Sequence, residues 1–590
     1  MRRFSSILIA FTLLMTTWAW TTEHHVSPSG KDSNPGTRSQ PWRTIQHAAD
    51  SVAPGDIVYI HTGTYTEDVI FNISGTAGAY ITFSAAPGEK VTAKGLEFAR
   101  STAYLKLSKL TVQGFSVWGV FLRGSNHHIS LSGLTIIGGE AGVRITWGYS
   151  GQPPEDGPVS DVILKNSFIQ GSIYTAVDCT PGPCDRSIFR NLEITGAGGG
   201  QESWGADGLA VERGKDILVE DCYIHDNGGD GIDLNSRDFK GNVSGVVVRR
   251  NIVVRNHRTG IKLWAGGRIE NNILWGQGHT PVSIGAYPST YEVVNNTIAY
   301  NMWDEDFSVR NYAFVAAYPD GGTSSKVDLT LLNNIFAFNS GDALGGPTGL
   351  YLGEGVNLVS EGHNLFWSRE DGEIQAEFVK GDPWFSRTEI ADGTWAAATG
   401  QGTGETTADP LFVAGWQNVN LHLKANSPAI DAGTSENAPS VDCEGRQRPA
   451  GHGYDIGAYE YGASPKGPEI ELNKTSLRFT GEEGKDNPAP NYFKVRNSGS
   501  KKLTYKTRSN KKWIKLKPKK GSSKGERDKI EVTVDISSLK AGKYRGTIKV
   551  KSKKACNSPQ KVGVNLTIKK PEQLFLKRSK KSLLASSLYP

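Results

Sequence analysis

The sequence predicts an all-β chain in which a coiled stack of short parallel strands is followed by a small antiparallel β-sandwich. Its 69 glycines and its charged fraction of only 21% favour turn-rich β-structure over long helices. At 590 residues the chain is too long for one compact core, so several domains or a repeat architecture are expected. A strand-and-turn unit that recurs through the middle of the chain favours the repeat.

This unit recurs from about residue 100 to 370 and consists of a short apolar strand, a polar turn residue and a second short strand. The polar residue falls at Asn166, Asn191, Asp221, Asn251, Asn272, Asn296 and Asn334, with separations of 25, 30, 30, 21, 24 and 38 residues. A period in the twenties with variable insertions is typical of a parallel β-helix, whereas a β-propeller needs a longer and more uniform repeat. We expect these residues to form one structural column, in which each amide bonds the coils above and below.

The first residues indicate export. Arg2 and Arg3 precede an apolar run that ends at Trp20, which is short for a membrane anchor and typical of a secretory signal peptide. We expect residues 1–19 to be removed, with cleavage after Ala19, and the protein to be secreted, either outside the cell or at its surface. No later stretch approaches the length of a membrane helix.

The predicted β-helix occupies residues 20–374. It opens with a strand at His25 that ends in turn residues, and a short amphipathic helix after Pro41 would cover the open end of the stack. This opening resembles the N-terminal cap of secreted right-handed parallel β-helix proteins. Residues 375–462 lose the repeat and resemble the C-terminal closing module of such proteins, which would cover the last coil.

A separate basic domain is predicted over residues 463–570. Ser464-Pro-Lys-Gly-Pro has the composition of a linker, and alternating strands between Glu469 and Lys569 fit an antiparallel β-sandwich. The domain looks similar to the Ig-like β-sandwiches appended to bacterial carbohydrate-active enzymes. Residues 571–590 are expected to form a mobile basic tail.

Charge divides the chain in the same place. From Lys466 onward, 33 lysines and arginines face 10 aspartates and glutamates, which leaves 33 of the 66 basic and 50 of the 60 acidic residues for residues 1–465. Such a basic domain suggests attraction to polyanions, namely acidic polysaccharide, the cell envelope or nucleic acid, although a merely soluble lysine-rich surface would look the same. We expect an acidic polysaccharide as the partner, no nucleic acid, no membrane span and a monomer.

Five cysteines are an odd number for an exported chain. Cys179 and Cys184 bracket a Thr-Pro-Gly-Pro loop and could close a local disulfide. Cys222 lies in a strand-like run and is expected to be a buried free thiol. The sequence suggests no partner for Cys443 or Cys556.

The candidate chemistry lies in three phrases of one pattern: Ala-Asp-Gly-Leu-Ala-Val from residue 206, Gly-Asp-Gly-Ile-Asp-Leu from 229 and Arg-Thr-Gly-Ile-Lys-Leu from 258. Each gives a turn and a short strand with alternating apolar residues. On neighbouring coils, residues in register lie about 4.8 Å apart. Asp207 would then lie beside Asp230, and Asp233 beside Lys262, so that three carboxylates and one amine share an exposed patch.

The same register extends over further coils. The outward column is predicted to contain Arg144, Asp178, Ala210, Asp233, Lys262 and Ser283, and the turn column Ala141, Thr175, Asp207, Asp230, Thr259 and Thr280. Carboxylates this close repel one another unless a cation lies between them. Oxygen ligands suit a hard cation, and Ca²⁺ is the common one outside cells.

The patch resembles the family 9 polysaccharide lyases, which are pectate lyases on a right-handed β-helix. The resemblance rests on the Asp-Gly pair at 207, on the Asn-Gly-Gly-Asp-Gly-Ile-Asp phrase that ends at 233 and on the Gly-Ile-Lys-Leu phrase around 262. It implies that Asp207, Asp230 and Asp233 are Ca²⁺ ligands and that Lys262 is the Brønsted base.

The chain departs from the family at Gly229, where the family has one more aspartate, so that one metal ligand is missing. Asp226 or Asp178 could compensate. Arg144 could hold a second substrate carboxylate bidentately, although it lies about three coils from Asp233 and a solvated arginine is the simpler interpretation. Arg144 and Asp178 are the candidate substrate-binding residues.

These groups suit β-elimination on a uronate, in which the proton next to the carboxylate is removed and the glycosidic oxygen at C4 leaves. Ca²⁺ between enzyme and substrate carboxylates would withdraw charge and stabilise the developing anion. A neutral amine then takes the proton. Because lysine has an ordinary pKa of about 10.4, Lys262 as the base predicts an alkaline pH optimum.

Taken singly, an Asp-Gly pair is typical of turns and an outward lysine is typical of a soluble surface. Together and in register they favour a site, and we predict a secreted, Ca²⁺-dependent polysaccharide lyase that cleaves polygalacturonate or a related uronic-acid polymer. Two alternatives stay open: a glycoside hydrolase that uses two of the aspartates as acid and base, and a non-catalytic polysaccharide-binding or adhesive β-helix protein.

Overall fold

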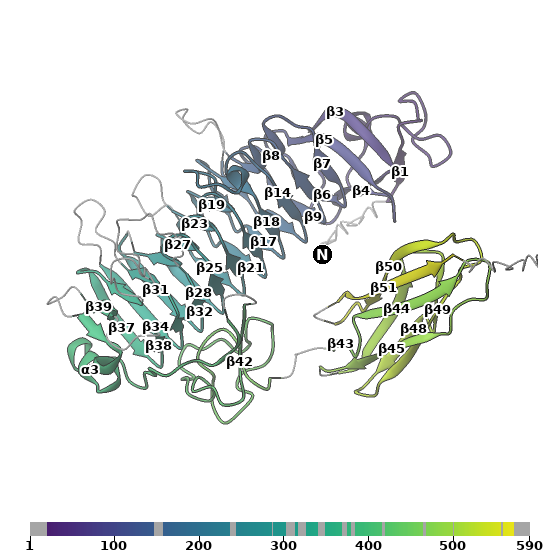
Figure 1. Ribbon diagram of the computed structural model, residues 1–590. Helices are drawn as coiled ribbons and strands as arrows, with labels where there is room; N and C mark the ends of the chain where they lie inside the picture. Colours follow the sequence, from purple (N-terminus) through teal and green to yellow (C-terminus); the bar gives the residue numbers. More distant parts are fainter. Residues whose placement is uncertain are drawn as a thin grey trace, which may run out of the picture. The chain divides into compact units, whose positions relative to one another are not determined.

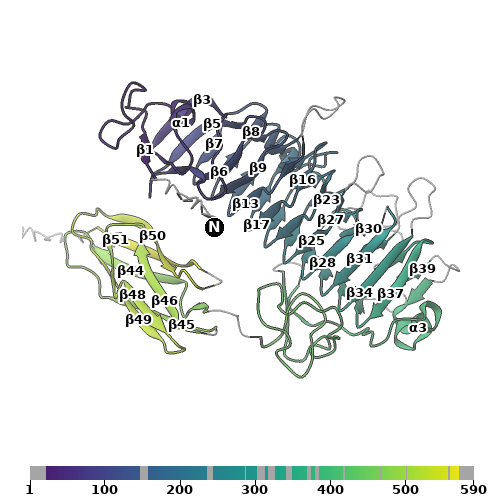
Figure 2. The ribbon, with the colours of Figure 1, turned by 180° about the vertical axis from the view of Figure 1, so that it is seen from behind.

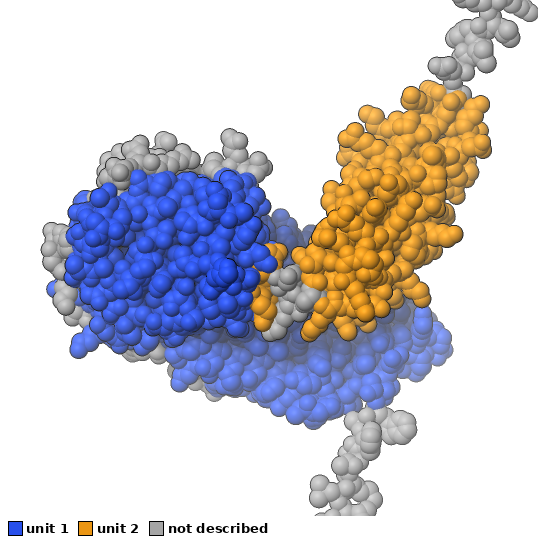
Figure 3. All heavy atoms as spheres, turned by 90° about the horizontal axis from the view of Figure 1, so that it is seen from below, with its two compact units in different colours: residues 1–444, 448–462 blue, residues 445–447, 463–590 orange. Residues whose placement is uncertain are grey.

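The computed structural model describes residues 21–146, 157–235, 243–285, 287–301, 313–316, 326–339, 349–368, 374–378, 384–415, 419–463, 468–499, 501–555 and 558–570. The chain divides into two compact units, residues 1–444 with 448–462, and residues 445–447 with 463–590 (Figure 3). No helix in the described ranges is long and apolar enough to cross a membrane. The expected signal peptide and basic tail lie outside these ranges.

The first unit is a right-handed parallel β-helix, as the sequence predicts, and its strands stack on three faces (Figures 1 and 2). The back face is a 15-stranded sheet. It contains β1 (Glu23–Val26), β2 (Ile57–Ile60), β4 (Ile81–Ala85), β6 (Ala103–Ser108), β9 (His127–Ser132), β13 (Ile163–Lys165), β17 (Ile188–Arg190), β21 (Leu218–Glu220), β25 (Val246–Arg249), β28 (Gly267–Glu270), β31 (Ser289–Val294), β34 (Val327–Leu332) and β37 (Val356–Gly362), with β12 (Val159–Ser160) and β16 (Cys184–Asp185) beside them.

The other two faces belong to one 23-stranded sheet that forks at β5. The side face contains β7 (Thr111–Gln113), β10 (Thr135–Ile137), β14 (Phe168–Gln170), β18 (Glu193–Thr195), β22 (Tyr223–His225), β26 (Ile252–Val254), β29 (Ile273–Trp275), β32 (Thr297–Ala299), β35 (Ile335–Ala337) and β38 (Leu365–Trp367). The site face contains β3 (Gly63–Phe71), β5 (Val91–Phe98), β8 (Trp118–Leu122), β11 (Ala141–Ile145), β15 (Val177–Cys179), β19 (Leu209–Val211), β23 (Ile232–Leu234), β27 (Ile261–Leu263), β30 (Val282–Ile284), β33 (Phe314–Ala316), β36 (Leu350–Leu352), β39 (Ile374–Phe378) and the antiparallel β40 (Trp384–Ser386).

A short helix caps the N-terminal end, as expected. In α1 (Ile45–Ser51), the Thr44 hydroxyl accepts a hydrogen bond from the backbone N–H of His47 at 3.1 Å, which satisfies one of the free donors of the first turn. The helix buries Ile45, Ala48 and Ala49 in the same core that fills the β-helix. The apolar spacing after Pro41 therefore produces a cap for the first coils.

The polar column differs from the expected one by one residue at three positions. Four of the predicted residues, with Asn364 added, form a buried ladder in which each amide nitrogen donates to the side-chain oxygen on the next coil at 3.0 or 3.1 Å: Asn251, Asn272, Asn296, Asn334 and Asn364. Asn166, Asn191 and Asp221 instead lie one residue earlier in the turn, with φ angles of 53°, 51° and 58°. They occupy the left-handed corner, a conformation that Asn and Asp adopt more readily than most residues.

A second buried ladder, which was not predicted from the sequence, runs beside the first. It contains Asn227, Asn256, Gln277, Asn301 and Asn339. Successive members are 29, 21, 24 and 38 residues apart. The same four separations lead from Cys222, whose backbone N–H bonds Asn251, along the first ladder to Asn334. This ladder starts at Asn227, three residues before Asp230, so it fixes the coil that carries the candidate site.

The two parts of the C-terminal module pack against different regions of the β-helix. Helices α2 (Arg387–Ala391) and α3 (Thr394–Thr399) bury Ile390 and Trp395 in the core of the β-helix at its end (Figure 1). The described residues of 409–415 and 419–461 pack elsewhere than on the last coil's open end. Their apolar residues, including Phe412 of β41 (Phe412–Ala414), Leu421 of β42 (Asn420–Leu423) and Ile456, pack with outward residues of β29, β32, β35 and β38 on the side face.

A pair of glutamates ends the first asparagine ladder. Glu405 accepts the backbone N–H of Asn364 at 2.6 Å, and Glu361 accepts the Asn364 amide at 3.0 Å and the Trp395 indole N–H at 3.0 Å. The two buried carboxyls interact with each other, and because two ionised carboxylates this close would repel, a proton on one of them is favoured. Burial raises the pKa of both, and the neighbouring Glu361 raises the pKa of Glu405 further.

This pair makes the stability of the β-helix end depend on pH. A raised folded-state pKa stabilises the fold below the ordinary glutamate pKa of about 4.3, and that stabilisation is lost as pH rises through the raised values. We expect this pair to lower the denaturant midpoint as pH rises, and Glu405→Gln to make the fall with pH less steep. Exposed Glu436 provides the control, since Glu436→Gln should leave the slope unchanged; an unchanged slope in Glu405→Gln would contradict the shared proton.

The second unit is a β-sandwich, as predicted. One sheet has the order β43 (Ile470–Leu472), β45 (Asn491–Asn497), β49 (Asp528–Val534) and β47 (Ile514–Lys517); the other has the order β44 (Ser476–Glu482), β51 (Gln560–Lys569), β50 (Gly542–Lys551), β46 (Leu503–Ser509) and β48 (Lys520–Ser523). Pairing is antiparallel except between β44 and β51, which are parallel. Inward residues such as Phe493 and Val550 form a core of their own.

The possible disulfide between Cys179 and Cys184 is not formed. Both residues are free thiols with no exposed surface, and their side chains hydrogen bond to each other. Burial raises the pKa of the Cys179 thiol well above its usual range. Cys222 is a buried free thiol, as the sequence analysis expects.

Candidate active site

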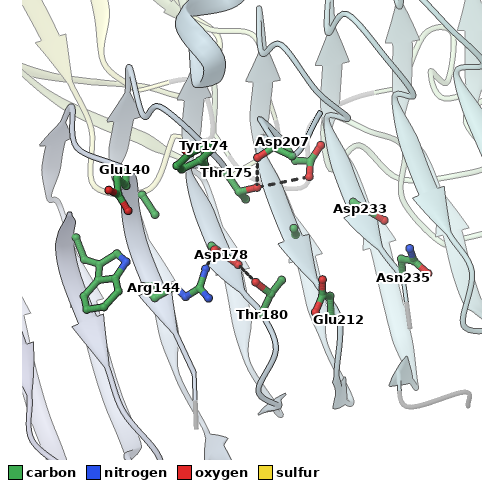
Figure 4. A pocket seen from close by; sticks show the side chains of 14 residues that line it. Glu140, Arg144, Tyr174, Thr175, Asp178, Thr180, Asp207, Glu212, Asp233 and Asn235 are labelled. Carbon is green, nitrogen blue, oxygen red and sulfur yellow. Dashed lines mark hydrogen bonds and ion pairs between the residues drawn. The ribbon is translucent and has the colours of Figure 1, made fainter. Parts of the chain in front are cut away.

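The outward column on the site face has the register that the sequence predicts. Arg144 pairs with Asp178, Asp178 with Ala210, Ala210 with Asp233, Asp233 with Lys262 and Lys262 with Ser283, each on the next parallel strand. The apolar residues on either side of each member, such as Ile232 and Leu234, are fully buried. Because the inward residues are held in the core, alternation places the column on the outer surface of neighbouring coils (Figure 4).

The turn column brings Asp207 and Asp230 together. Asp207 Oδ1 accepts the backbone N–H of Asp230 at 2.7 Å, and Asp230 Oδ1 accepts the backbone N–H of Thr259 at 2.8 Å. Gly208 and Gly231 make this stacking possible, since a Cβ at either would lie 2.7 Å from the carbonyl oxygen of the next glycine in the column. The aspartates therefore use one oxygen each to hold the stack. The second oxygen of Asp207 lies 3.5 Å from the Thr175 hydroxyl, and that of Asp230 lies 3.8 Å from Lys262 Nζ.

Lys262 lies against two of the aspartates. Its Nζ is 3.4 Å from Asp233 Oδ2 and 3.8 Å from Asp230 Oδ2, and it is 4.3 Å from the centroid of the Trp264 ring. Burial alone would lower the pKa of Lys262, but the carboxylates of Asp233, Asp230 and Asp207 outweigh burial and raise it. The amine is therefore protonated at neutral pH in this arrangement.

The carboxyls are affected in the opposite sense. Burial raises the pKa of Asp207 well above its usual range, and the charges of Asp230 and Asp233 add to this. Burial raises the pKa of Asp233 to about 7, against the opposing effect of Lys262. Three acids this close do not all ionise readily without a further cation.

The fit of these residues to a metal is partial. Their oxygen-only chemistry suits Ca²⁺, and Asp233 Oδ1 is buried without a hydrogen-bond partner. Even so, no group of three or more His, Cys, Asp or Glu side chains within the described ranges is arranged to hold a metal ion. Lys262 takes the place of a counter-ion between Asp230 and Asp233, so substrate or water oxygens would have to complete a cation site.

The structure leaves no room for a side chain at Gly229, where the family has an aspartate. A Cβ on Gly229 would lie 2.3 Å from Asp207 Oδ1, so an aspartate there would displace Asp207. Neither proposed substitute compensates. Asp226 is held by Arg255 through two contacts of 2.7 Å, and Asp178 is held by Arg144 and, at 2.6 Å, by the Thr180 hydroxyl.

Arg144 is therefore not a solvated arginine but the ion-pair partner of Asp178 on the next coil. Both residues line a groove of about 260 Å³ beside the aspartates (Figure 4). Five acidic residues line this groove against one arginine: Glu140, Asp178, Asp207, Glu212 and Asp233, and Arg144. The groove thus has an acidic surface, and Trp118 and Tyr174 lie along it.

Arg258 is a residue that the sequence analysis did not single out. Its Nε is 3.9 Å from Asp230 Oδ1, its Nη1 is 3.6 Å from Glu202, and its guanidinium lies 3.3 Å from the centroid of the Trp204 ring. Trp204 is 80% exposed. Arg258 opens the third repeated phrase, so its position four residues before Lys262 was the signal that could have found it.

Three families match parts of the chain. Residues 24–152 match "Pel9A-like, right handed beta helix region", residues 95–301 match "Right handed beta helix region" and residues 469–562 match "Viral BACON domain". The chain has a pectate lyase-like right-handed β-helix. The candidate site lies within residues 95–301, and the sandwich coincides with the third match.

The chain is also similar to individual proteins. An uncharacterized protein, YwoF of Bacillus subtilis (strain 168), is 25% identical over 345 residues, which are 47% of this chain and 74% of that protein. The pectate lyase PEL9 of Emericella nidulans is 37% identical over 86 residues, which are 14% of this chain and 21% of that enzyme. The crystal structure of pectate lyase Pel9A is 17% identical, with a TM-score of 0.41 over 75% of this chain and 97% of that one.

Proposed function

We propose that this protein is a secreted polysaccharide lyase, similar to the family 9 lyases, that cleaves polygalacturonate or a related uronic-acid polymer by β-elimination. One observation carries the proposal: Lys262 lies on the outer face of adjacent coils, 3.8 Å from Asp230 and 3.4 Å from Asp233, which itself lines the groove. The match of residues 24–152 to a Pel9A-like β-helix region supports the choice of substrate class.

Lys262 is the base in this proposal. Its neutral amine takes the proton from C5 of a uronate, the electrons of that C–H bond form the C4–C5 double bond, and the C4–O bond breaks. The departing glycosidic oxygen takes a proton and becomes the end of one product, while the other product carries the unsaturated uronate. Arg258, close to Asp230, is a cation on the same side that would bind and orient the substrate carboxylate.

Asp207, Asp230 and Asp233 would hold Ca²⁺ in this proposal. When bound, the cation would neutralise the substrate carboxylate and favour loss of the neighbouring proton. The acidic lining of the groove supports the requirement, because its ionised carboxylates repel a polyuronate unless a cation compensates their charge.

The test is the formation of unsaturated products, followed by near-ultraviolet absorbance on polygalacturonate with and without EDTA. We expect absorbance to grow, EDTA to stop it and added Ca²⁺ to restore it. Thermal unfolding with Ca²⁺ provides a readout besides activity, since a bound ion raises Tm and Asp230→Asn should weaken that rise. Full activity in EDTA would contradict the cation, and cleavage without absorbance would contradict elimination.

A glycoside hydrolase is the second candidate, and the raised pKa of Asp233 is the observation that supports it. A carboxyl with its pKa at about 7, Asp233, next to other aspartates has the pattern of a general acid and base. In that case Lys262→Met would reduce cleavage little, and the products would contain no double bond.

A further inference from the structure

The sandwich carries a second charged surface, far in the sequence from the aspartates. On the five-stranded sheet, Lys549 of β50 lies directly opposite Arg508 of β46 on one side and opposite Lys561 of β51 on the other. One step along, Lys506 of β46 lies between Lys551 of β50 and Lys520 of β48. All six side chains are exposed, so two rows of three cations cross the outer surface of this sheet.

Few carboxylates lie near these six cations to neutralise their charge. Among the outward residues of these five strands, the sole carboxylate is Glu482, which lies opposite Lys569 at the far end of β44, while Arg478, Lys543 and Arg545 add further positive charge. Paired residues of adjacent strands have Cβ atoms about 5 Å apart, and like charges placed directly opposite each other destabilise a sheet. A surface with this arrangement is stabilised when an anion neutralises it.

The other sheet of the same sandwich shows that this is not a general property of a lysine-rich domain. Its outward residues mix both signs: Glu471 pairs with Arg496, and Glu531 lies opposite Lys517. Tyr492 lies between Lys474 and Lys529, with their ammonium groups 4.7 and 4.5 Å from its ring centroid. Uncompensated positive charge is therefore concentrated on the five-stranded sheet.

We propose that the outer face of the five-stranded sheet, the cationic face (Lys506, Arg508, Lys520, Lys549, Lys551 and Lys561), binds an acidic polysaccharide. Parallel rows of cations on a flat sheet are complementary to an extended polymer with a carboxylate on each sugar. The outward residues of these strands include no aromatic side chain, which single-stranded nucleic acid binding uses as a stacking platform. This site lies in the second unit and is independent of cleavage, so it would anchor the protein on its polymer.

The test compares two full-length variants that remove equal charge. The face variant replaces Lys506, Lys549, Lys551 and Lys561 by Gln; the control variant replaces Lys494, Lys515, Lys517 and Lys529 of the other sheet by Gln. Both are made together with Lys262→Met, so that the polymer stays intact, and binding to polygalacturonate is measured at about 0.15 M salt, where the Debye length is about 8 Å. Denaturant midpoints of all variants establish that each is folded.

We expect the face variant to raise the Kd for polygalacturonate at least about tenfold and to flatten its salt dependence, while the control variant changes it less than about threefold. Equal losses in both variants would mean non-specific attraction and would overturn the proposal. So would oligo-dT or vesicles of anionic lipid that bind the cationic face more tightly than polygalacturonate does. Failure of the lyase proposal is separate, because the protein with Lys262 would then bind the polymer through this face without forming unsaturated products.

Discussion

Replacing Lys262 by methionine should lower the rate of double-bond formation on polygalacturonate by about 10²- to 10⁴-fold, the usual contribution of a general base. Methionine replaces most of the aliphatic stem of the side chain but removes the amine, and with it both the proton acceptor and the contact of the ammonium group with the Trp264 ring. Since the ammonium also balances Asp230 and Asp233, the loss of charge alone could disturb the site. The rate is followed as near-ultraviolet absorbance per mole of folded protein.

Lys262→Arg separates the two roles. Arginine keeps the positive charge next to the aspartates but stays protonated in proteins, so it cannot accept the proton. We expect this variant to be as stable as the unmodified protein and nearly as inactive as Lys262→Met. Retained activity in Lys262→Arg would mean that this residue acts through its charge and that the base is elsewhere.

The pH profile gives a second readout of the same residue. The aspartates raise the pKa of Lys262, so its neutral, proton-accepting form becomes populated only as pH rises. Activity should therefore increase towards alkaline pH, and weakening this field with Asp233→Asn should move the rise to lower pH. A profile that is flat or falls with pH would contradict lysine as the base.

Asn296→Ala should strongly destabilise the β-helix. The Asn296 oxygen accepts the backbone N–H of Asn272 at 2.9 Å and its amide at 3.0 Å, and the Asn296 amide donates to Ile269, Val294 and Asn334. Each buried polar group left without a partner costs about 1–3 kcal/mol, so the loss of unfolding free energy should reach about 3 kcal/mol or more. Denaturant unfolding followed by far-ultraviolet circular dichroism measures it.

Asn191→Ala is the matched control. Asn191 donates to Asn166 at 2.8 Å, but on the exposed corner of the coil, where water can replace the lost partner. We expect less than about 1 kcal/mol of destabilisation there. Equal effects at Asn191 and Asn296 would contradict the distinction between the outer corner and the buried ladder.

The sequence could predict the repeat, but it could not place every polar residue in it. Asparagine is favoured in the left-handed corner because it tolerates positive φ, and in the next, inward position because its amide bonds two coils. The doublets Asn271-Asn272, Asn295-Asn296 and Asn333-Asn334 fill both positions. The single Asn166 and Asn191 fill only the corner, so the pattern alone could not separate the two columns.

The strand register of the candidate site was predictable because the apolar residues on either side of each site residue must face the core. Ile232 and Leu234, like Ile261 and Leu263, must be inside, and a shift of one residue would bury Asp233 and Lys262 instead. Contacts that depend on side-chain reach were not predictable in this way. The ion pair of Arg144 with Asp178, the position of Arg258 and the lack of room at Gly229 required coordinates.

The mass of the products tests the central claim most directly. Polygalacturonate is digested with the full chain in the presence of Ca²⁺, and the oligosaccharides are weighed by mass spectrometry. If Lys262 and the three aspartates carry out β-elimination, each new non-reducing end is lighter by one water molecule than a hydrolysed end, and these products are absent with Lys262→Met. Oligosaccharides of the hydrated mass, formed equally well by Lys262→Met, would contradict the proposed role of this site.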